Sequence, residues 1–152
     1  ELVRILRRLS ADPRSKDIAY LWVPKKKPSA ASLRRISEGE QLEVNRRYLC
    51  RHRKPWWHID VPSPPAYFLS YMGRRKPQIV DNRNGLLNLN NIHGLYLREG
   101  VAIDLSRRVA NWLGSTQGTA ALLNHARHYY GGMWKLEPGD VERLKLPPSL
   151  FR

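Results

Sequence analysis

The segment CRHRKPWWHI, residues 50–59, combines a cluster of basic side chains with two adjacent tryptophans. Basic side chains neutralise phosphates, and indole rings stack on bases or sugars. If the segment is a strand, neighbouring side chains point to opposite faces, so Trp56 and Trp57 would be divided between the core and a ligand. The alternative is that both rings are structural. The cations of the segment are Arg51, Arg53 and Lys54.

The segment SPPAY, residues 63–67, is a second candidate for chemistry. Enzymes that methylate base amino groups can use a polar residue, two prolines and an aromatic ring that stacks on the flipped base. Here Ala66 follows Ser63-Pro64-Pro65, and Tyr67 comes one place late. We therefore favour a rigid linker between strands over a self-contained methyltransferase fragment that uses Ser63-Pro64-Pro65.

Other catalytic and cofactor signatures are lacking in the sequence. No strand runs into a glycine-rich turn that opens a helix, as a methyl-donor site would require. His125 and His128 share a face of a predicted helix, but no carboxylate or cysteine joins them at metal-ligand spacing. The single Cys50 excludes an internal disulfide framework and is typical of a reducing compartment. We expect no catalytic residue, no cofactor and no metal in this chain, and a cytoplasmic location.

The overall charge favours a polyanionic partner. The 152 residues include 27 Lys and Arg against 13 Asp and Glu, a net charge of +14. The excess is clustered, because residues 46–76 contain eight basic residues and only one acidic residue, Asp60. A generally basic surface that serves solubility is the competing interpretation. No apolar run is long enough to cross a membrane, so we expect no membrane partner.

The elements that must position these side chains are read from periodicity and turn residues. Short alternating or apolar runs bounded by Pro, Gly and Asn predict strands at 17–23, 56–61, 67–72, 78–81 and 92–97. Helical spacing with Ser or Thr caps predicts helices at 29–40, 102–115, 115–132 and 137–144. The basic residues then fall on loops between strands, where binding residues are commonly found.

The predicted class is α+β, with a β-rich N-terminal and central part and a small helical C-terminal subdomain. Residues 1–37 form an N-terminal segment with a strand, a basic loop and a short helix. Residues 38–100 form the β-rich recognition part, and residues 101–152 complete the same domain.

Asparagines concentrate in the segment DNRNGLLNLNNIHG, residues 81–94. We interpret Asn82 and Asn84 as turn residues, because Asn accepts left-handed and turn conformations. Asn88 and Asn90 have strand spacing and would share one face, which suits the bidentate amide recognition of adenine.

Four segments in order carry a resemblance to a known family: RRYLCRHRKPWWHI, PPAYFLSYMGRRKPQIVDN, NLNNIHGLY and YYGGMWKLEPGDVERLKLP. Together they cover roughly residues 38–148. This ordered set resembles the C-terminal target-recognition region of N6-adenine DNA methyltransferases from restriction-modification systems, of the TaqI-like specificity type. The resemblance implies a module that selects the DNA sequence. It also implies that a separate N-terminal catalytic domain binds S-adenosylmethionine and carries out the methyl transfer. The first residue is not Met, which agrees with the expectation that the sequence is a piece of a longer chain.

The sequence thus predicts a double-stranded DNA-recognition module that itself carries no chemistry. Arginine favours guanine edges and asparagine favours adenine edges, and the expected base readers are Arg74, Arg75, Asn88 and Asn90. The expected phosphate contacts are Lys25, Lys26, Lys27, Arg51, Arg53, Lys54 and Lys76. Trp56 and Trp57 are the stacking candidates. A single-stranded or RNA-binding domain and a protein-docking domain remain alternatives.

Overall fold

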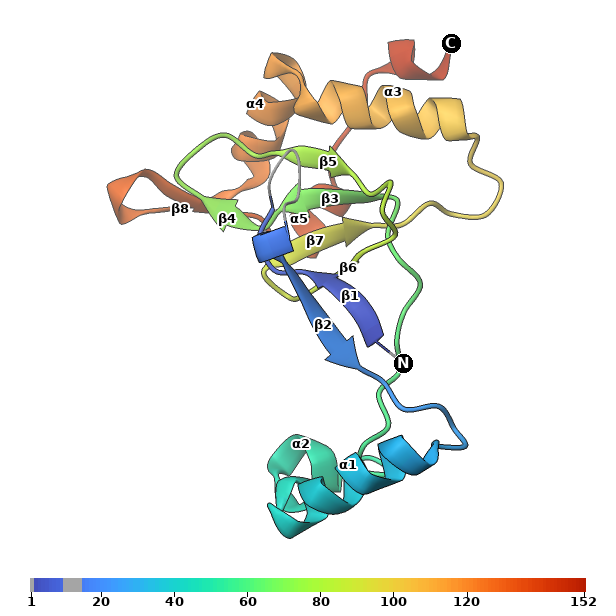
Figure 1. Cartoon of the computed structure of the whole chain (residues 1–152). Coiled ribbons are helices and arrows are strands. Elements are labelled where there is room, and N and C mark those ends of the chain that lie inside the picture. The colour runs from blue at the N-terminus through green and yellow to red at the C-terminus, as the bar shows by residue number, and fades with distance from the viewer. Residues whose placement is uncertain (1, 10–14) are drawn as a thin grey trace. The chain divides into compact units, whose positions relative to one another are not determined.

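The structure is a computed structural model that describes residues 2–9 and 15–152 (Figure 1). The chain divides into two compact units. The first unit comprises residues 1–4 and 20–62, and the second comprises residues 5–19 and 63–152. Helices and short sheets together confirm the predicted α+β class. Among the described residues, no helix combines the length and the apolarity needed to cross a bilayer.

Three-stranded sheets organise the described part of the chain. One sheet orders its strands β2-β1-β6, with β1 at Leu2–Leu6, β2 at Ile18–Trp22 and β6 at Leu87–Asn88. A second orders them β5-β3-β7, with β3 at Tyr67–Ser70, β5 at Ile79–Asp81 and β7 at Ile92–Leu95. A third orders them β4-β9-β8, with β4 at Met72–Gly73, β8 at Arg127–Tyr129 and β9 at Met133–Lys135. The helices are α1 (Ala30–Gln41), α2 (Tyr48–Arg51), α3 (Ile103–Gly114), α4 (Thr116–His125) and α5 (Pro138–Glu142).

The core of the second unit forms on both faces of the central strand β3. Successive strand residues alternate between faces. Leu69 packs with Leu113 and Leu122 of the helices, whereas Phe68 packs on the other side with Leu6 of β1. Because both faces are covered, β3 is a continuous apolar run, as the sequence showed. In Figure 1, α3 and α4 lie over the sheet β5-β3-β7.

The turn from α3 into α4 is tight and depends on two small residues. Ser115 ends α3 and caps α4, where its side chain accepts a hydrogen bond from the Gly118 backbone N–H at 3.1 Å. A Cβ on Gly118 would lie 2.0 Å from the Trp112 carbonyl oxygen. Only glycine therefore lets the first turn of α4 approach the end of α3 so closely.

The first unit is held by contacts between α1 and the chain that follows α2. Ser29 caps α1 by accepting a hydrogen bond from the Ser32 backbone N–H at 3.2 Å, as the predicted helix start requires. The Trp56 indole Nε1–H donates to Glu40 Oε1 at 3.0 Å. A Cβ added to Gly39 would lie 2.7 Å from the Trp56 ring, so the ring packs directly on the backbone of α1.

The predicted strand at 56–61 is wrong. The backbone turns at this point, because the His58 N–H bonds to the Pro55 carbonyl, and the segment joins no sheet. The alternation that would expose one tryptophan therefore does not apply, and both rings are half-buried. The contact of Trp56 with α1 is tertiary, so local propensity did not reveal it.

The predicted helix at 115–132 ends seven residues early. α4 stops at His125, and residues 127–135 form the hairpin β8–β9 instead. Gly131 and Gly132, the last residues of the predicted helix, instead form the hairpin turn with φ of 73° and 71°. Aromatic residues pack well on a pleated surface, and pairing with β9 outweighs helix extension here. The expected helical pairing of His125 and His128 is consequently also wrong, because His128 lies in β8.

Candidate nucleic-acid interface

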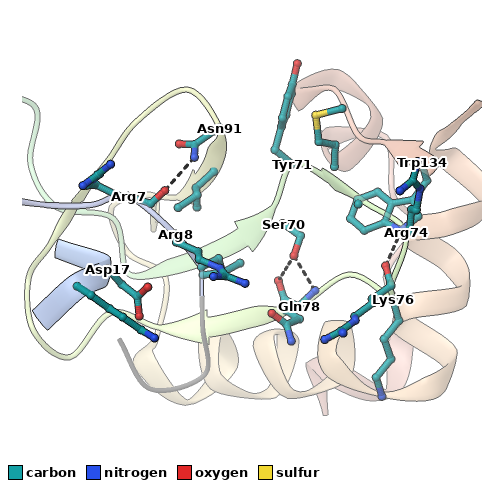
Figure 2. A pocket seen from close by; sticks show the side chains of 16 residues that line it. Arg7, Arg8, Asp17, Ser70, Tyr71, Arg74, Lys76, Gln78, Asn91 and Trp134 are labelled. Carbon is teal, nitrogen blue, oxygen red and sulfur yellow. Dashed lines mark hydrogen bonds between the residues drawn. The ribbon is translucent and has the colours of Figure 1, made fainter. Parts of the chain in front are cut away.

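An open groove in the second unit gathers the basic residues of three chain segments. Its cavity volume is about 790 Å³. Figure 2 shows Arg7 and Arg8 on one side of Ser70 and Gln78, with Arg74 and Lys76 on the other. We call this cavity the basic groove. Its charged lining residues are Arg7, Arg8, Lys16, Asp17, Arg74, Arg75 and Lys76.

The lining is strongly cationic, since its described residues include six basic side chains and one carboxylate. Asp17 is buried, whereas all six basic residues are exposed. Exposed guanidinium and ammonium groups that converge on one hollow create a positive field that attracts a polyanion. The groove brings together three sequence-predicted residues, namely Arg74, Arg75 and Lys76. The contributions of Arg7, Arg8 and Lys16 were missed, although an apolar run ending in two arginines, LVRILRR, was the available signal.

The Arg74–Lys76 loop is anchored from below by a buried tryptophan. β4 pairs antiparallel with β9, and Gly73 lies opposite Trp134. The Trp134 Nε1–H donates to the Arg75 carbonyl oxygen at 2.6 Å, which fixes the loop backbone while its side chains remain exposed. The loop is closed at its base by Ser70, whose Oγ accepts a hydrogen bond from the Gln78 N–H at 3.0 Å.

The opposite wall is the end of β1. β1 pairs parallel with β6, with Ile5 opposite Leu87. Beyond the strand, the Arg7 N–H donates to the Asp17 carbonyl at 2.7 Å, and the Arg7 carbonyl accepts from Asn91 Nδ2 at 3.0 Å. The backbone of Arg7 is therefore fixed on both sides, and its side chain faces the groove.

Tyr71 completes a wall of the groove and is itself held by neighbours. The ring of His93 meets it edge-on, with centroids 5.2 Å apart, and Lys135 Nζ lies 5.1 Å from its centroid. Lys135 Nζ lies 2.7 Å from Glu137 Oε1. The hydrogen bond to Glu137, with a second to Tyr71, raises the pKa of Lys135 above its usual value, so this lysine stays charged at neutral pH.

The two asparagines expected to read bases lie elsewhere. The Asn88 side-chain amide donates to the Ile92 carbonyl at 2.7 Å and to the Leu89 carbonyl at 3.2 Å. Its donors are thus committed to the β6–β7 turn rather than to a ligand. Asn90 lies in that turn, exposed, so the two do not share a strand face as expected. Asn91, not predicted, is the asparagine that lines the groove.

The remaining sequence-predicted contacts belong to the first unit. Lys25, Lys26 and Lys27 lie in the exposed loop between β2 and α1. Arg51 ends α2, with its guanidinium 5.2 Å from the Tyr48 ring centroid. Arg53 and Lys54 are exposed beyond it, next to the half-buried pair Trp56 and Trp57. These residues thus belong to the first unit, whereas the basic groove belongs to the second.

The Ser63-Pro64-Pro65 segment is built into the scaffold. Its Pro65 carbonyl accepts from Asn82 Nδ2 at 2.7 Å, and Pro65 itself is buried. Asn82 also bonds both the N–H and the carbonyl of Leu86, which confirms it as a turn residue. In the part of the chain that the structure describes, no three His, Cys, Asp or Glu side chains lie close enough to hold a metal ion.

Comparison with known proteins identifies the domain. The sequence matches the family "Type II methyltransferase M.Eco57I, C-terminal domain" over residues 10–151. The chain belongs to this family. The match confirms the resemblance to a C-terminal domain of restriction-modification methyltransferases.

Two curated proteins contain segments that are similar to this chain. Type II methyltransferase M.XamI of Xanthomonas campestris pv. amaranthicola is 35% identical over 100 residues, which is 66% of this chain and 18% of the relative. Type II methyltransferase M.AccI of Acinetobacter calcoaceticus is 27% identical over 110 residues, 71% of this chain and 20% of the relative. The chain therefore spans about a fifth of their length. No solved structure matches it.

Proposed function

We propose that this chain is a target-recognition domain that holds double-stranded DNA in the basic groove, on behalf of an N6-adenine methyltransferase of a restriction-modification system. The observation that carries the proposal is the convergence, among the described residues, of six exposed cations on one groove that also holds the buried Asp17. Family membership supports it, because the relatives are named methyltransferases and the matched region is their C-terminal domain.

The side chains of the groove would have two roles, phosphate binding and base recognition. Arg7, Arg8, Lys16 and Lys76 would bind phosphates, which releases counterions and makes binding steeply dependent on salt. The planar guanidinium groups of Arg74 and Arg75 suit the O6 and N7 edge of guanine. Because Trp134 fixes the Arg75 backbone carbonyl, little backbone entropy of the loop is lost when the two arginines engage a base.

The methyl transfer itself would occur outside this chain. In the proposal, a separate catalytic domain of a longer protein binds S-adenosylmethionine and accepts the extruded adenine. The position of the DNA bound in the basic groove determines which adenine reaches the catalytic domain. We place no catalytic role on Ser63, because Pro65, two residues further on, is buried and its carbonyl already accepts a hydrogen bond from Asn82.

The salt dependence of duplex binding tests the proposal. The chain with Arg7→Gln, Arg8→Gln and Lys76→Gln loses three of the groove cations assigned to phosphates, so its log–log salt slope should fall by about 2.7. The matched control removes three exposed charges outside the groove by Arg98→Gln, Arg107→Gln and Lys145→Gln. Fluorescence anisotropy on a labelled duplex over a salt series measures both.

Equal slope changes in the two triple variants would mean that only net charge matters, and the groove would lose its role. Competition with an unlabelled single strand of the same sequence tests the alternative that the chain is a single-strand-binding domain. If the single strand displaces the duplex at lower concentration, the chain is a single-strand binder.

A further inference from the structure

The tip of the β8–β9 hairpin presents an aromatic ring to solvent. Tyr130 is fully exposed, and Tyr129 before it is 45% exposed. A tyrosine ring normally buries much of its surface, so one displayed whole at a loop tip is informative. Its neighbours in the turn are Gly131 and Gly132, which leave the ring without lateral cover.

The hairpin holds this ring on a firm support. Tyr129 pairs with Met133 and His128 with Trp134, and Trp134 is buried in the core. His128 donates its Nε2–H to the Leu123 carbonyl at 2.9 Å, which ties β8 to the end of α4. The positive φ angles of both glycines close the turn in a conformation that other residues adopt only with strain.

The tip adjoins the basic groove. β4 runs antiparallel to β9 with Gly73 opposite Trp134, so the chain after Gly73 continues alongside β9 toward the hairpin turn. A Cβ on Gly131 would lie 3.8 Å from Arg74 Nη2. The hairpin projects next to β4 in Figure 1. A polyanion held by Arg74 therefore lies within reach of Tyr130.

We propose that Tyr130 is a stacking wedge that inserts between base pairs, or into the gap left by an extruded base, when the groove holds a duplex. The inference rests on the proposed function. Aromatic side chains stack on any base, and wedge residues in duplex-bending proteins partly unstack one step. A ring next to the DNA-binding Arg74 gains that stacking at little backbone cost, because the hairpin already positions it.

The experiment compares an intact labelled duplex with the same duplex carrying one abasic site, which offers the wedge a ready gap. The wild-type chain should prefer the abasic duplex. Tyr130→Ala should weaken binding to that duplex by roughly 5- to 150-fold, equivalent to about 1–3 kcal/mol, with less effect on the intact duplex. Tyr130→Phe should retain the preference, because it keeps the ring.

Tyr96→Ala is the matched control, since Tyr96 is also exposed but lies after β7, outside the groove. It should leave the preference unchanged. If Tyr130→Ala keeps the preference, or weakens both duplexes equally, the wedge is refuted while duplex binding stands. A wild-type chain that binds neither duplex refutes the proposed function and the wedge together. Full circular-dichroism signals establish that each variant is folded.

Discussion

Replacement of Trp134 by Phe separates the positioning of the groove from its charge. The change removes the Nε1–H that donates to the Arg75 carbonyl at 2.6 Å, and it removes part of a buried ring. Every cation of the basic groove remains. The Arg74–Lys76 loop should therefore loosen without any change in net charge.

The expected cost follows from the two losses. A hydrogen bond of this type contributes about 0.5–1.5 kcal/mol net to stability. Because Arg75 is exposed, water can replace the lost donor at its carbonyl, so no further penalty for an unsatisfied group is expected. Phe fills only part of the buried site of the Trp134 ring, and the cavity left behind adds roughly 1–2 kcal/mol to the loss of stability. This is a fraction of what complete truncation to Ala would cost. The free energy of unfolding should thus fall by about 2–3 kcal/mol, which for a chain of this size lowers the melting temperature by roughly 5–10 °C.

Urea unfolding followed by far-UV circular dichroism measures the loss of stability, and anisotropy at a temperature where the variant is fully folded measures duplex affinity. The affinity should fall while the salt slope stays nearly constant, because the charges are intact. Trp112→Phe is the control, since Trp112 packs on the same core cluster and does not line the basic groove. If both folded variants bind as tightly as the wild type, the anchoring argument is wrong.

Two further outcomes test the scaffold. Asn82→Ala removes three hydrogen bonds to Pro65 and Leu86 and should cost about 2–3 kcal/mol in urea unfolding; a loss below roughly 0.5 kcal/mol would contradict their structural role. Glu137→Gln keeps an acceptor for the α5 cap but removes the ion pair with Lys135. Because the folded-state pKa of Lys135 is raised, the ion pair's contribution to the free energy of unfolding is complete below about pH 10.4 and is lost above it. The difference in melting temperature between wild type and variant should therefore be constant near neutral pH and should shrink at alkaline pH. A gap that widens with rising pH would refute this assignment.

The sequence predicted those elements whose signals are local. The Ser29 cap, the apolar run of β3 and the helical spacing of α3 each depend on residues close in the chain, and each lies where expected. The Arg74–Lys76 turn was also recognised as a basic loop. Local turn chemistry and periodicity are sufficient for such features.

The missed elements depend on distant partners. β4 and β6 are two residues long, which is too short for any periodicity to appear. β1 is stabilised by parallel pairing with β6, far along the chain, so its arginines could not be assigned to the same hollow as Lys76. Trp56 was read as a strand residue because its contact with α1 is invisible to local propensity.

The parallel pairing of β1 with β6 has a consequence for the order of assembly. The register joins Ile5 to Leu87, so the loop that closes on pairing contains more than half of the chain. Closing a long loop is entropically costly, and contacts between residues so far apart generally form late and slow folding. A partly folded chain would carry Arg74–Lys76 without the opposing arginines, and only the completed unit would offer both sides of the hollow to a nucleic acid.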